Sequence, residues 1–398
     1  MHKAKEDSLK ENSLKLSSDQ QSALARLLAW YKEDSKKPFI TLGGYAGTGK
    51  TTLIAELKKE LVKDNKKIKI AFCSYTGRAA QNLKNKLIEA NALKWRDTIS
   101  TIHGLIYDPI ENSNEEIIGW MRKEELEKDL IIIDEGSMVD ETIWRDLLSY
   151  GIPIIAVGDH GQLPPIKGTF NLMEEPNILL TQIHRQAKDN PIIRVSQHAR
   201  TSGVVPVKKY GGKVIKYDKN DPFSHEISSE LLESYSTDTL ILCGYNATRT
   251  KINHFIRNAL GFHSPNPLPG ERVICLRNNQ KKGVYNGMLG TIKNITEKDS
   301  SWYDVEILLD EGNLYVGLIY APQFGADTAI NFTKSRKHAN KGDLFDFGYA
   351  LTVHKAQGSQ AKKVILFEER FSKMDDDMWK RWLYTGITRA ENELYLFG

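Results

Sequence analysis

The chain has 398 residues, a length that predicts two or three domains and excludes a single small binding module. Hydrophobic residues make up 40% and charged residues 27% of the sequence, which is typical of globular proteins and excludes a disordered or fibrous chain. The net charge of +4 does not identify a partner, because nucleic-acid binding depends on a local basic surface. No apolar run reaches the roughly 18 residues of a membrane span, so we expect a cytoplasmic protein without membrane contacts.

The first part of the chain alternates predicted strands and helices. The strands are predicted at 39–42, 68–75, 130–134 and 152–158. The helices are predicted at 22–31, 51–63, 77–90 and 141–150. Alternation of this kind predicts a parallel sheet with helices on both faces, and we assign residues 1–178 to this first domain.

A second series of the same kind predicts a second α/β domain, formed by residues 179–265 and 343–398. Its strands are predicted at 177–180, 239–243, 363–367 and 393–397, and its helices at 191–200, 248–260 and 377–384. The proline-rich stretch 263–270 interrupts this domain and favours an extended linker. Short strand patterns then follow at 271–276, 291–295, 302–309 and 314–320. They predict an all-β insert over residues 266–342.

The segment Gly44-Tyr-Ala-Gly-Thr-Gly-Lys-Thr51 matches the phosphate-binding loop pattern and stands between a predicted strand and a predicted helix. In such loops the backbone amides at the helix N-terminus bind phosphate, the lysine neutralises its oxygens and the final hydroxyl ligates magnesium. The sequence therefore predicts a site for ATP and Mg²⁺, with Thr51 on the metal. The loop residues expected to contact the nucleotide are Gly44, Ala46, Gly47, Thr48, Gly49, Lys50, Thr51 and Thr52.

An acidic pair, Asp134-Glu135, follows the apolar run at 130–133. A strand of this kind is buried on both faces, and its carboxyl end opens into the binding crevice of a parallel sheet. Asp134 is expected to hold Mg²⁺ directly or through water, and Glu135 to orient and deprotonate the attacking water. A solvated acidic turn is the alternative, which explains the carboxylates but not their position after the apolar run.

Further ordered segments between Leu16 and Leu396 carry recognisable motifs, at 16–20, 74–80, 100–104, 157–165, 180–186, 352–359 and 382–390. They resemble the motifs of superfamily 1 helicases, in particular the 5′→3′ branch that includes RecD, Pif1 and the phage helicase Dda. The resemblance implies an α/β fold with two RecA-like P-loop domains, a small hairpin insert in the first and an SH3-like β-barrel insert in the second. It also implies that Gln20 reads adenine, that Gln162 senses the γ-phosphate and that Arg185 and Arg389 reach it from the second domain. A surface salt bridge is the alternative for either arginine taken alone.

The resemblance gives the catalytic set as Lys50, Glu135, Gln162, Arg185 and Arg389, and adds Gly358 to the nucleotide contacts. It implies contacts with single-stranded DNA from four segments, whose residues are Tyr75, Thr76, Arg78, Thr101, His103, Asn286, Thr352, His354 and Lys355. Tyr75 stands where relatives usually have proline. Each of these segments taken alone is also typical of an ordinary polar loop.

Residues 104–129 form a connection that is too long for a simple loop. Apolar stretches at 105–110 and 117–121 flank a polar turn at 112–114, a pattern that predicts a hairpin. The resemblance implies that this hairpin is a strand-separating pin.

Together these patterns predict an ATP- and Mg²⁺-dependent 5′→3′ translocase and DNA helicase. We expect it to act as a monomer on single-stranded DNA and duplex junctions, in a bacterial cell or a phage-infected host. Partners such as a single-stranded DNA-binding protein or replication and recombination proteins stay open. Two other functions also stay open: an RNA or RNA–DNA helicase, and an ATP-gated clamp that binds nucleic acid without unwinding it.

Overall fold

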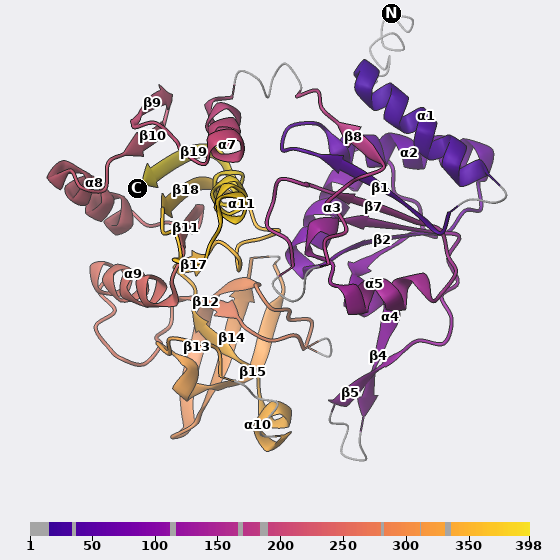
Figure 1. Cartoon of the computed structure of the whole chain (residues 1–398). Helices are drawn as coiled ribbons and strands as arrows, with labels where there is room; N and C mark the ends of the chain where they lie inside the picture. The colour runs from indigo at the N-terminus through magenta and orange to yellow at the C-terminus, as the bar shows by residue number, and fades with distance from the viewer. Residues whose placement is uncertain are drawn as a thin grey trace, which may run out of the picture.

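The computed structural model describes residues 16–33, 37–111, 117–165, 170–183, 190–279, 282–310, 312–330 and 336–398. Two α/β units lie side by side in this part of the chain, and a β-rich unit lies below the second (Figure 1). No helix within those ranges combines the length and the apolar character that crossing a bilayer requires.

The first unit is built on a six-stranded sheet with the order β3-β2-β6-β7-β1-β8, in which all paired strands run parallel. The strands are β1 (Phe39–Gly44), β2 (Ile70–Ser74), β3 (Thr98–Thr101), β6 (Leu130–Asp134), β7 (Ile154–Gly158) and β8 (Ile178–Leu180). The apolar runs of β1, β2, β6 and β7 are buried almost throughout, as a sheet covered on both faces requires. Their carboxyl ends therefore meet at one edge of the sheet.

Five helices accompany this sheet in the described residues. They are α1 (Ser18–Lys32), α2 (Lys50–Asp64), α3 (Gly77–Glu89), α4 (Ile102–Ile106) and α5 (Glu141–Leu148), and a 3₁₀ turn spans Gly136–Met138. Leu27 and Leu53 pack on one face of the sheet, and Ile106 and Trp144 pack on the other. The prediction of a parallel sheet between two helical layers is confirmed for this unit.

A two-stranded hairpin projects from this unit (Figure 1). Its strands β4 (Tyr107–Glu111) and β5 (Ile117–Arg122) are antiparallel. The Tyr150 hydroxyl donates to the carbonyl oxygens of Ile106 and Lys123, each at 2.9 Å, and so holds the base of the hairpin against the body. The polar turn expected at 112–114 lies outside the described residues.

The second unit contains a six-stranded sheet with the order β17-β11-β18-β19-β10-β9, in which only β9 is antiparallel to its neighbour. The strands are β9 (Lys208–Gly211), β10 (Val214–Tyr217), β11 (Thr239–Cys243), β17 (Ala350–Thr352), β18 (Ala361–Phe367) and β19 (Ala390–Phe397). The helices are α7 (Pro191–Ser202), α8 (Pro222–Glu233), α9 (Asn246–Ala259) and α11 (Asp376–Ile387). The sequence did not predict β17, nor β9, β10 and α8, which lie together at one side of this unit (Figure 1).

The β-rich unit, which we call the insert, is a five-stranded antiparallel sheet with the order β15-β14-β13-β12-β16. Its strands are β12 (Arg272–Cys275), β13 (Leu289–Asp299), β14 (Trp302–Leu309), β15 (Leu314–Tyr320) and β16 (Phe345–Phe347); a 3₁₀ turn spans Ala321–Gln323, and α10 covers Arg336–Lys341. A single parallel bridge between Ile319 and Asp343 brings the outer strand β15 to the chain that leads into β16. The sheet therefore curls towards closure around a core that includes Val273 and Ile307.

Two buried ion pairs fasten the insert to the second unit. Arg257 of α9 contacts Glu271 with its Nε at 2.5 Å, and the two side chains are 2% and 0% exposed. Arg249 of the same helix contacts Asp346 of β16 at 3.0 Å. Removing one partner of a buried pair leaves the other charge buried and unpaired, which lowers the free energy of unfolding by about 3–5 kcal/mol. The insert and the second unit are therefore joined as one body.

Two predicted boundaries are wrong. Strand β8 was expected to open the second domain, yet it pairs with β1 and closes the first sheet, so that this sheet extends through Leu180 and not to 178. The Asn177 side chain fixes this register, because its Oδ1 accepts from the backbone amide and the hydroxyl of Thr41, each at 2.9 Å. Beyond the strand, Asp19 accepts from the amides of Thr181 at 2.7 Å and Gln182 at 3.0 Å.

The second wrong boundary is the end of the insert. It was predicted at residue 342, but β16 pairs with β12 and extends the insert to Phe347. A strand of three residues carries no signal for which of two neighbouring sheets it joins, since that choice depends on pairing partners far away in the sequence.

Candidate active site

The turn from β1 into α2, residues 44–51, is called the phosphate loop below. Gly47 and Gly49 have φ of 82° and 76°, a left-handed conformation that side-chain-bearing residues rarely adopt. Gly49 is the N-cap of α2 and offers no capping side chain, so the first amides of the helix keep their donors for another partner. The Lys50 ammonium donates across the loop to the carbonyl oxygens of Gly44 at 2.6 Å and Tyr45 at 3.1 Å. This arrangement suits an anion.

Gln20 lies behind the phosphate loop and outside the cavity described below. Its Nε2 donates to the carbonyl oxygens of Thr48 at 3.2 Å and Gly49 at 3.3 Å, and its Oε1 accepts from the Ser17 amide at 3.0 Å. Both ends of the amide are thus bonded within the protein, and the residue is 2% exposed. In this structure Gln20 braces the loop, and reading a base would require it to release these partners.

The acidic pair ends β6 at the carboxyl edge of the sheet. Asp134 lies beside Ser74 of β2, and its Oδ1 accepts from the Glu135 amide at 3.0 Å. Glu135 has a φ of 55°, a conformation that costs a non-glycine residue about 1–3 kcal/mol and is typical of functional sites. Burial raises the pKa of both carboxyls, while Lys50 acts in the opposite direction on each and Arg389 does so on Glu135.

These groups share a cavity of about 320 Å³ that both α/β units line. The first unit supplies Ala46, Gly47, Gly49, Lys50, Thr51, Thr52, Ala79, Asn82, Leu83, Lys86, Asp134, Glu135, Asp159 and Gln162, and the second supplies Gly358, Gln360, Thr388 and Arg389. Gly44 and Thr48 stand behind this surface; a Cβ on Gly44 would lie 2.6 Å from the Thr48 hydroxyl, so that only glycine fits there. Arg185 lies outside the described residues.

Gln162 and Asp159 belong to the turn after β7. The Gln162 side chain is buried, and its Nε2 lies 3.5 Å from Asp159 Oδ2. Its Oε1 has no hydrogen-bond partner among the described residues. A buried polar atom without a partner costs about 1–3 kcal/mol, and the two ends of an amide exchange places by a half-turn. Gln162 therefore holds an amide that a ligand in the cavity can engage.

Arg389 reaches the cavity from the second unit, just after α11. It is 3% exposed, and its guanidinium donates to the carbonyl oxygens of Thr385 at 3.0 Å and Ser359 at 3.3 Å and to the Thr388 hydroxyl at 3.2 Å. These partners are neutral, so they orient the guanidinium without cancelling its charge. Such a group is suited to hold two oxygens of a phosphoryl group.

One set of lining residues was missed by the sequence reasoning. Ala79, Asn82, Leu83 and Lys86 face the cavity from α3, at the spacing of one helical stripe. Lys86 adds a positive charge, which lowers the pKa of Asp134 against the effect of burial. The signal was present in the sequence, because the stripe starts three residues after Thr76, but it resembles an ordinary core-facing pattern.

The cavity fits a magnesium nucleotide by its chemistry. Lys50, Lys86, Arg389 and the open amides of α2 provide the positive potential that a triphosphate needs. The Thr51 hydroxyl and the Asp134 carboxylate are oxygen donors of the kind that Mg²⁺ prefers. Within the described ranges, His, Cys, Asp and Glu side chains gather nowhere in a set of three or more that could hold a metal by themselves. A Mg²⁺ ion here would take its other ligands from phosphate and water.

The residues predicted to contact DNA converge in part. Thr76 caps α3 by accepting from the Ala79 amide at 3.2 Å. A Cβ on Gly358, which has a φ of 75°, would lie 2.8 Å from the Thr76 hydroxyl. Arg78 donates to the Gln360 carbonyl oxygen at 2.9 Å. Two segments that are far apart in the sequence thus meet across the boundary between the α/β units.

Thr101 and His103 lie farther along the same edge. Thr101 is 6% exposed and caps α4 by accepting from the Gly104 amide at 3.1 Å. The His103 ring packs on Tyr107 at 4.4 Å and on Trp120 at 5.6 Å between centroids, and burial lowers its pKa. These two residues therefore sit at the base of the hairpin. Tyr75, at the end of β2, is 37% exposed.

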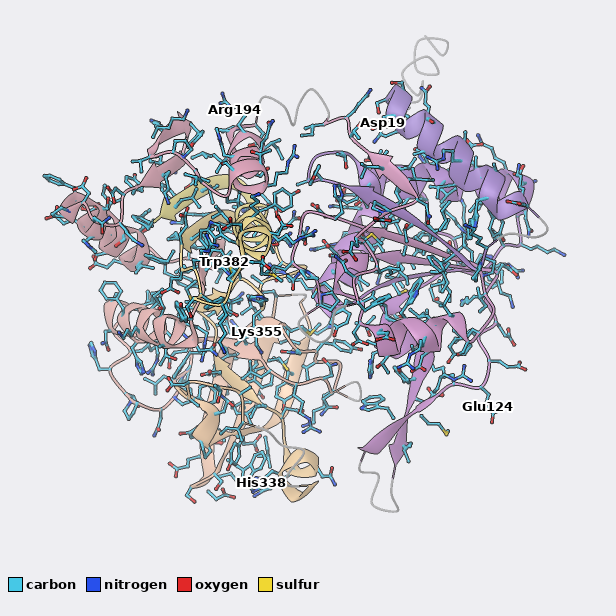
Figure 2. The ribbon with its side chains drawn as sticks, viewed as in Figure 1. Asp19, Glu124, Arg194, His338, Lys355 and Trp382 are labelled. Atoms are coloured by element: carbon cyan, nitrogen blue, oxygen red, sulfur yellow. The ribbon has the colours of Figure 1, made fainter. Side chains whose placement is uncertain are left out.

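Lys355 lies near the centre of the molecule, where the second unit meets the insert (Figure 2). Its Nζ lies 3.4 Å from Asn286 Oδ1 of the insert. Lys355 and Thr352 also line a small cavity of about 60 Å³ beside Arg249. Burial lowers the pKa of Lys355 and of His354. The structure thus joins Asn286, Thr352 and Lys355 in one place.

Comparison with known proteins gives two family matches. Residues 28–168 match the family of AAA domains, and residues 347–397 match the UvrD-like helicase C-terminal domain. The first matched stretch contains the phosphate loop and the acidic pair, and the second contains Arg389.

Among individual proteins, the ATP-dependent RecD2 DNA helicase of Deinococcus radiodurans is 25% identical over 412 residues, which cover 96% of this chain and 49% of RecD2. The RecD subunit of the RecBCD enzyme from Buchnera aphidicola subsp. Schizaphis graminum is 27% identical, over 90% of this chain and 70% of that subunit. The chain thus spans about half the length of RecD2. The fold is similar to that of a Bacteroides Pif1 helicase solved with ADP-AlF3 and single-stranded DNA, with a TM-score of 0.56, 20% identity and coverage of 96% and 92% of the two chains.

Proposed function

We propose that this chain, which belongs to the superfamily 1 helicases of the RecD and Pif1 type, is an ATP-driven translocase that moves along single-stranded DNA and separates duplexes. The observation that carries the proposal is the cavity of about 320 Å³ that both α/β units line. Lys50 and Glu135 come from the first unit and Arg389 from the second. Because hydrolysis needs groups from both, approach of the two units and turnover are coupled.

Six side chains of the cavity have a role in this proposal. Lys50 and the open amides of α2 bind the β- and γ-phosphates, and Thr51 and Asp134 would hold Mg²⁺, which would neutralise phosphate oxygens. Glu135 takes a proton from the attacking water, an assignment that its place in the cavity beside Asp134 supports. Arg389 stabilises the charge that develops on the transferred phosphoryl group. Gln162 senses the γ-phosphate.

Two further assignments extend this set. Arg185 adds a second arginine from the other unit, and Gln20 contacts the adenine after it releases the phosphate loop.

The two α/β units are RecA-like motor domains in this proposal, and the insert is an SH3-like barrel. Its curled sheet and the bridge between Ile319 and Asp343 support that assignment. The hairpin of β4 and β5 acts as the separation pin. In this proposal single-stranded DNA contacts Tyr75, Thr76, Arg78, Thr101, His103, Asn286, Thr352, His354 and Lys355. These side chains suit sugar and phosphate contacts without sequence readout.

The first experiment measures ATP hydrolysis with and without single-stranded DNA. We expect slow hydrolysis alone and strong stimulation by DNA, because Arg389 lies on the unit opposite to Glu135. Lys50→Ala is the control, since it removes the charge on the phosphates and is expected to lose ATP binding and turnover together. Equal rates with and without DNA would contradict the proposal.

The second experiment compares nucleic-acid substrates under single-turnover conditions. The short, strand-rich insert with its Asn286-Gly287 segment is similar to the RecD and Pif1 barrel, so we expect unwinding of duplexes with a 5′ single-stranded tail and little unwinding with a 3′ tail. Preference for the 3′ tail would overturn the direction and leave the ATP site intact. Stimulation by RNA homopolymers equal to that by DNA would favour an RNA helicase, and hydrolysis without strand separation would favour a clamp.

A further inference from the structure

The hydroxyl of Tyr384 is bonded entirely to the opposite α/β unit. Tyr384 lies on α11 of the second unit and is fully buried. Its hydroxyl oxygen accepts from the Ala46 amide of the phosphate loop at 2.8 Å, and its proton is donated to Asp159 Oδ2 at 2.7 Å. A single side chain of the second unit therefore connects the phosphate loop to the turn after β7.

The direction of these bonds is fixed by the charges nearby. Burial, followed by the negative charge of Asp159, raises the pKa of Tyr384 well above its ordinary value, so the phenol stays protonated and donates to the carboxylate. Asp159 is 1% exposed, and its Oδ1 also accepts from the backbone amide of Gly161 at 3.0 Å. Its Oδ2 lies 3.5 Å from Nε2 of the Gln162 side chain. Tyr384 thus bonds to the carboxylate that also lies next to the Gln162 side chain.

Neighbouring residues hold α11 against the same turn without help from this hydroxyl. The Thr385 hydroxyl accepts from the Leu163 amide at 3.0 Å, and Arg381 donates to the Gln162 carbonyl oxygen at 3.2 Å. Gln357 donates to the Leu163 carbonyl oxygen at 2.9 Å. The aromatic ring of Tyr384 also belongs to the core of the second unit. A phenylalanine at this position keeps the ring and these contacts and removes only the hydroxyl.

We propose that Tyr384 is a positioning residue, which fixes the phosphate loop and Gln162 in their working geometry only while α11 is docked on the first unit. This inference rests on the proposed ATP hydrolysis in the same cavity. Tyr384 does not line that cavity among the described residues and acts through Ala46 and Asp159. When α11 withdraws, the Ala46 amide and the Asp159 carboxylate both lose a partner, so the hydrolytic geometry depends on the approach of the two units.

The test replaces Tyr384 by phenylalanine and uses Tyr395→Phe as the matched control. Tyr395 is also a buried tyrosine of the second unit, but its hydroxyl contacts Glu393, away from the boundary between the units. For Tyr384→Phe we expect the kcat of DNA-stimulated ATP hydrolysis to fall about tenfold, with KM for ATP within about threefold of wild type. We expect the control to match wild type. A normal kcat in Tyr384→Phe would overturn the inference.

A double-mutant cycle with Asp159→Asn separates positioning from general loss of structure. Because part of the effect of the hydroxyl passes through Asp159, we expect the loss of kcat in the double variant to be smaller than the product of the two single losses. Independent, multiplying effects would overturn the inference.

Amide hydrogen exchange tests the same contact without relying on hydrolysis. Tyr384→Phe is expected to speed exchange in residues 44–47 and 159–163, whereas Tyr395→Phe is not. Unchanged exchange would overturn the inference even in a fully active protein. If wild type hydrolyses no ATP, the proposed function fails, and the exchange result still decides whether Tyr384 holds the loop.

Discussion

The two α/β units present the same kind of turn, from a strand into a helix, and use it in opposite ways. In the first unit α2 begins without a side-chain cap, and Lys50 lies at its open first turn, although the Ala46 amide earlier in the loop donates to Tyr384. In the second unit α9 also begins without a side-chain cap, but two amides of the turn before it, those of Gly244 and Tyr245, donate to Glu369 at 2.7 Å and 2.9 Å. Glu369 also accepts from the Thr248 hydroxyl at 2.5 Å.

The turn from β11 into α9 therefore has the carboxylate of Glu369 bound to it, whereas the phosphate loop has no carboxylate of the protein on the first amides of α2 and is open to an external anion. The comparison shows that the two turns differ in the charge placed beside them, a lysine in the first unit and a carboxylate in the second. The two units also contribute different groups to the shared cavity. In the proposed function the first unit binds and activates ATP, and the second unit completes the site with Arg389.

The largest expected effect concerns the first unit. Glu135→Gln keeps the size of the side chain but removes the base, so we expect ATP hydrolysis to fall about 10³- to 10⁴-fold while ATP and DNA still bind. Steady-state hydrolysis and nucleotide binding by fluorescence measure the two effects separately. Near-normal turnover would show that another group is the base.

The contribution of the second unit is tested by Arg389→Ala. We expect the rate of hydrolysis to fall about 10³-fold and the affinity for ATP to stay within a few-fold, because such an arginine acts mainly on the charge of the transition state. Single-turnover hydrolysis at saturating ATP checks this. A tenfold loss of ATP affinity with a normal rate per bound ATP would make Arg389 a ground-state binding residue and weaken the division of labour.

The occupied turn is tested by Glu369→Ala. This change removes a charged acceptor from three donors, which is expected to cost about 2 kcal/mol of unfolding free energy and to lower Tm by about 5 °C. We expect hydrolysis to stay within about twofold of wild type, since Glu369 does not line the nucleotide cavity. ATP binding that appears in the Lys50→Ala background only after Glu369→Ala would reveal a second nucleotide site and break the comparison.

The smallest expected effect concerns the DNA-facing part of the second unit. Affinity for single-stranded DNA is expected to fall with salt, with a slope of about −0.7 per phosphate contacted. Lys355→Ala should make that slope shallower by about one such unit. Fluorescence anisotropy over a series of salt concentrations measures the slope. A slope equal to that of wild type would remove Lys355 from the path of the DNA.

The nucleotide cavity was largely predictable from the sequence because its residues lie in short segments of fixed geometry. The pattern Gly44 to Thr51 specifies a loop, and an apolar run ending in Asp134-Glu135 specifies a strand end. The contacts of Gln20 were not predictable in this way. Its partners are carbonyl groups of residues 48 and 49, and nothing in the sequence near Gln20 reveals them.

The contacts between the units were the hardest to predict. Tyr384 lies in a segment that resembles a known motif, but the bond from its hydroxyl to Asp159 spans 225 positions of sequence and depends on how two separate sheets dock. The pairing of β8 and β16 with their sheets was missed for the same reason. Local propensity determines that a strand forms, whereas its place in a sheet is decided by distant partners.

The fixed end of β8 has a mechanical consequence. Asp19 pins the backbone just after this strand, so the first unit is held firmly up to the point from which the chain continues to the second. Strand β8 lies at the top of the molecule and the insert at the bottom (Figure 1). In a rotation about a pivot near the end of β8, displacement grows with distance, and the insert moves with the second unit through Arg257 and Glu271. In the proposed function, a closing rotation about that point would therefore move the insert farther than the phosphate loop.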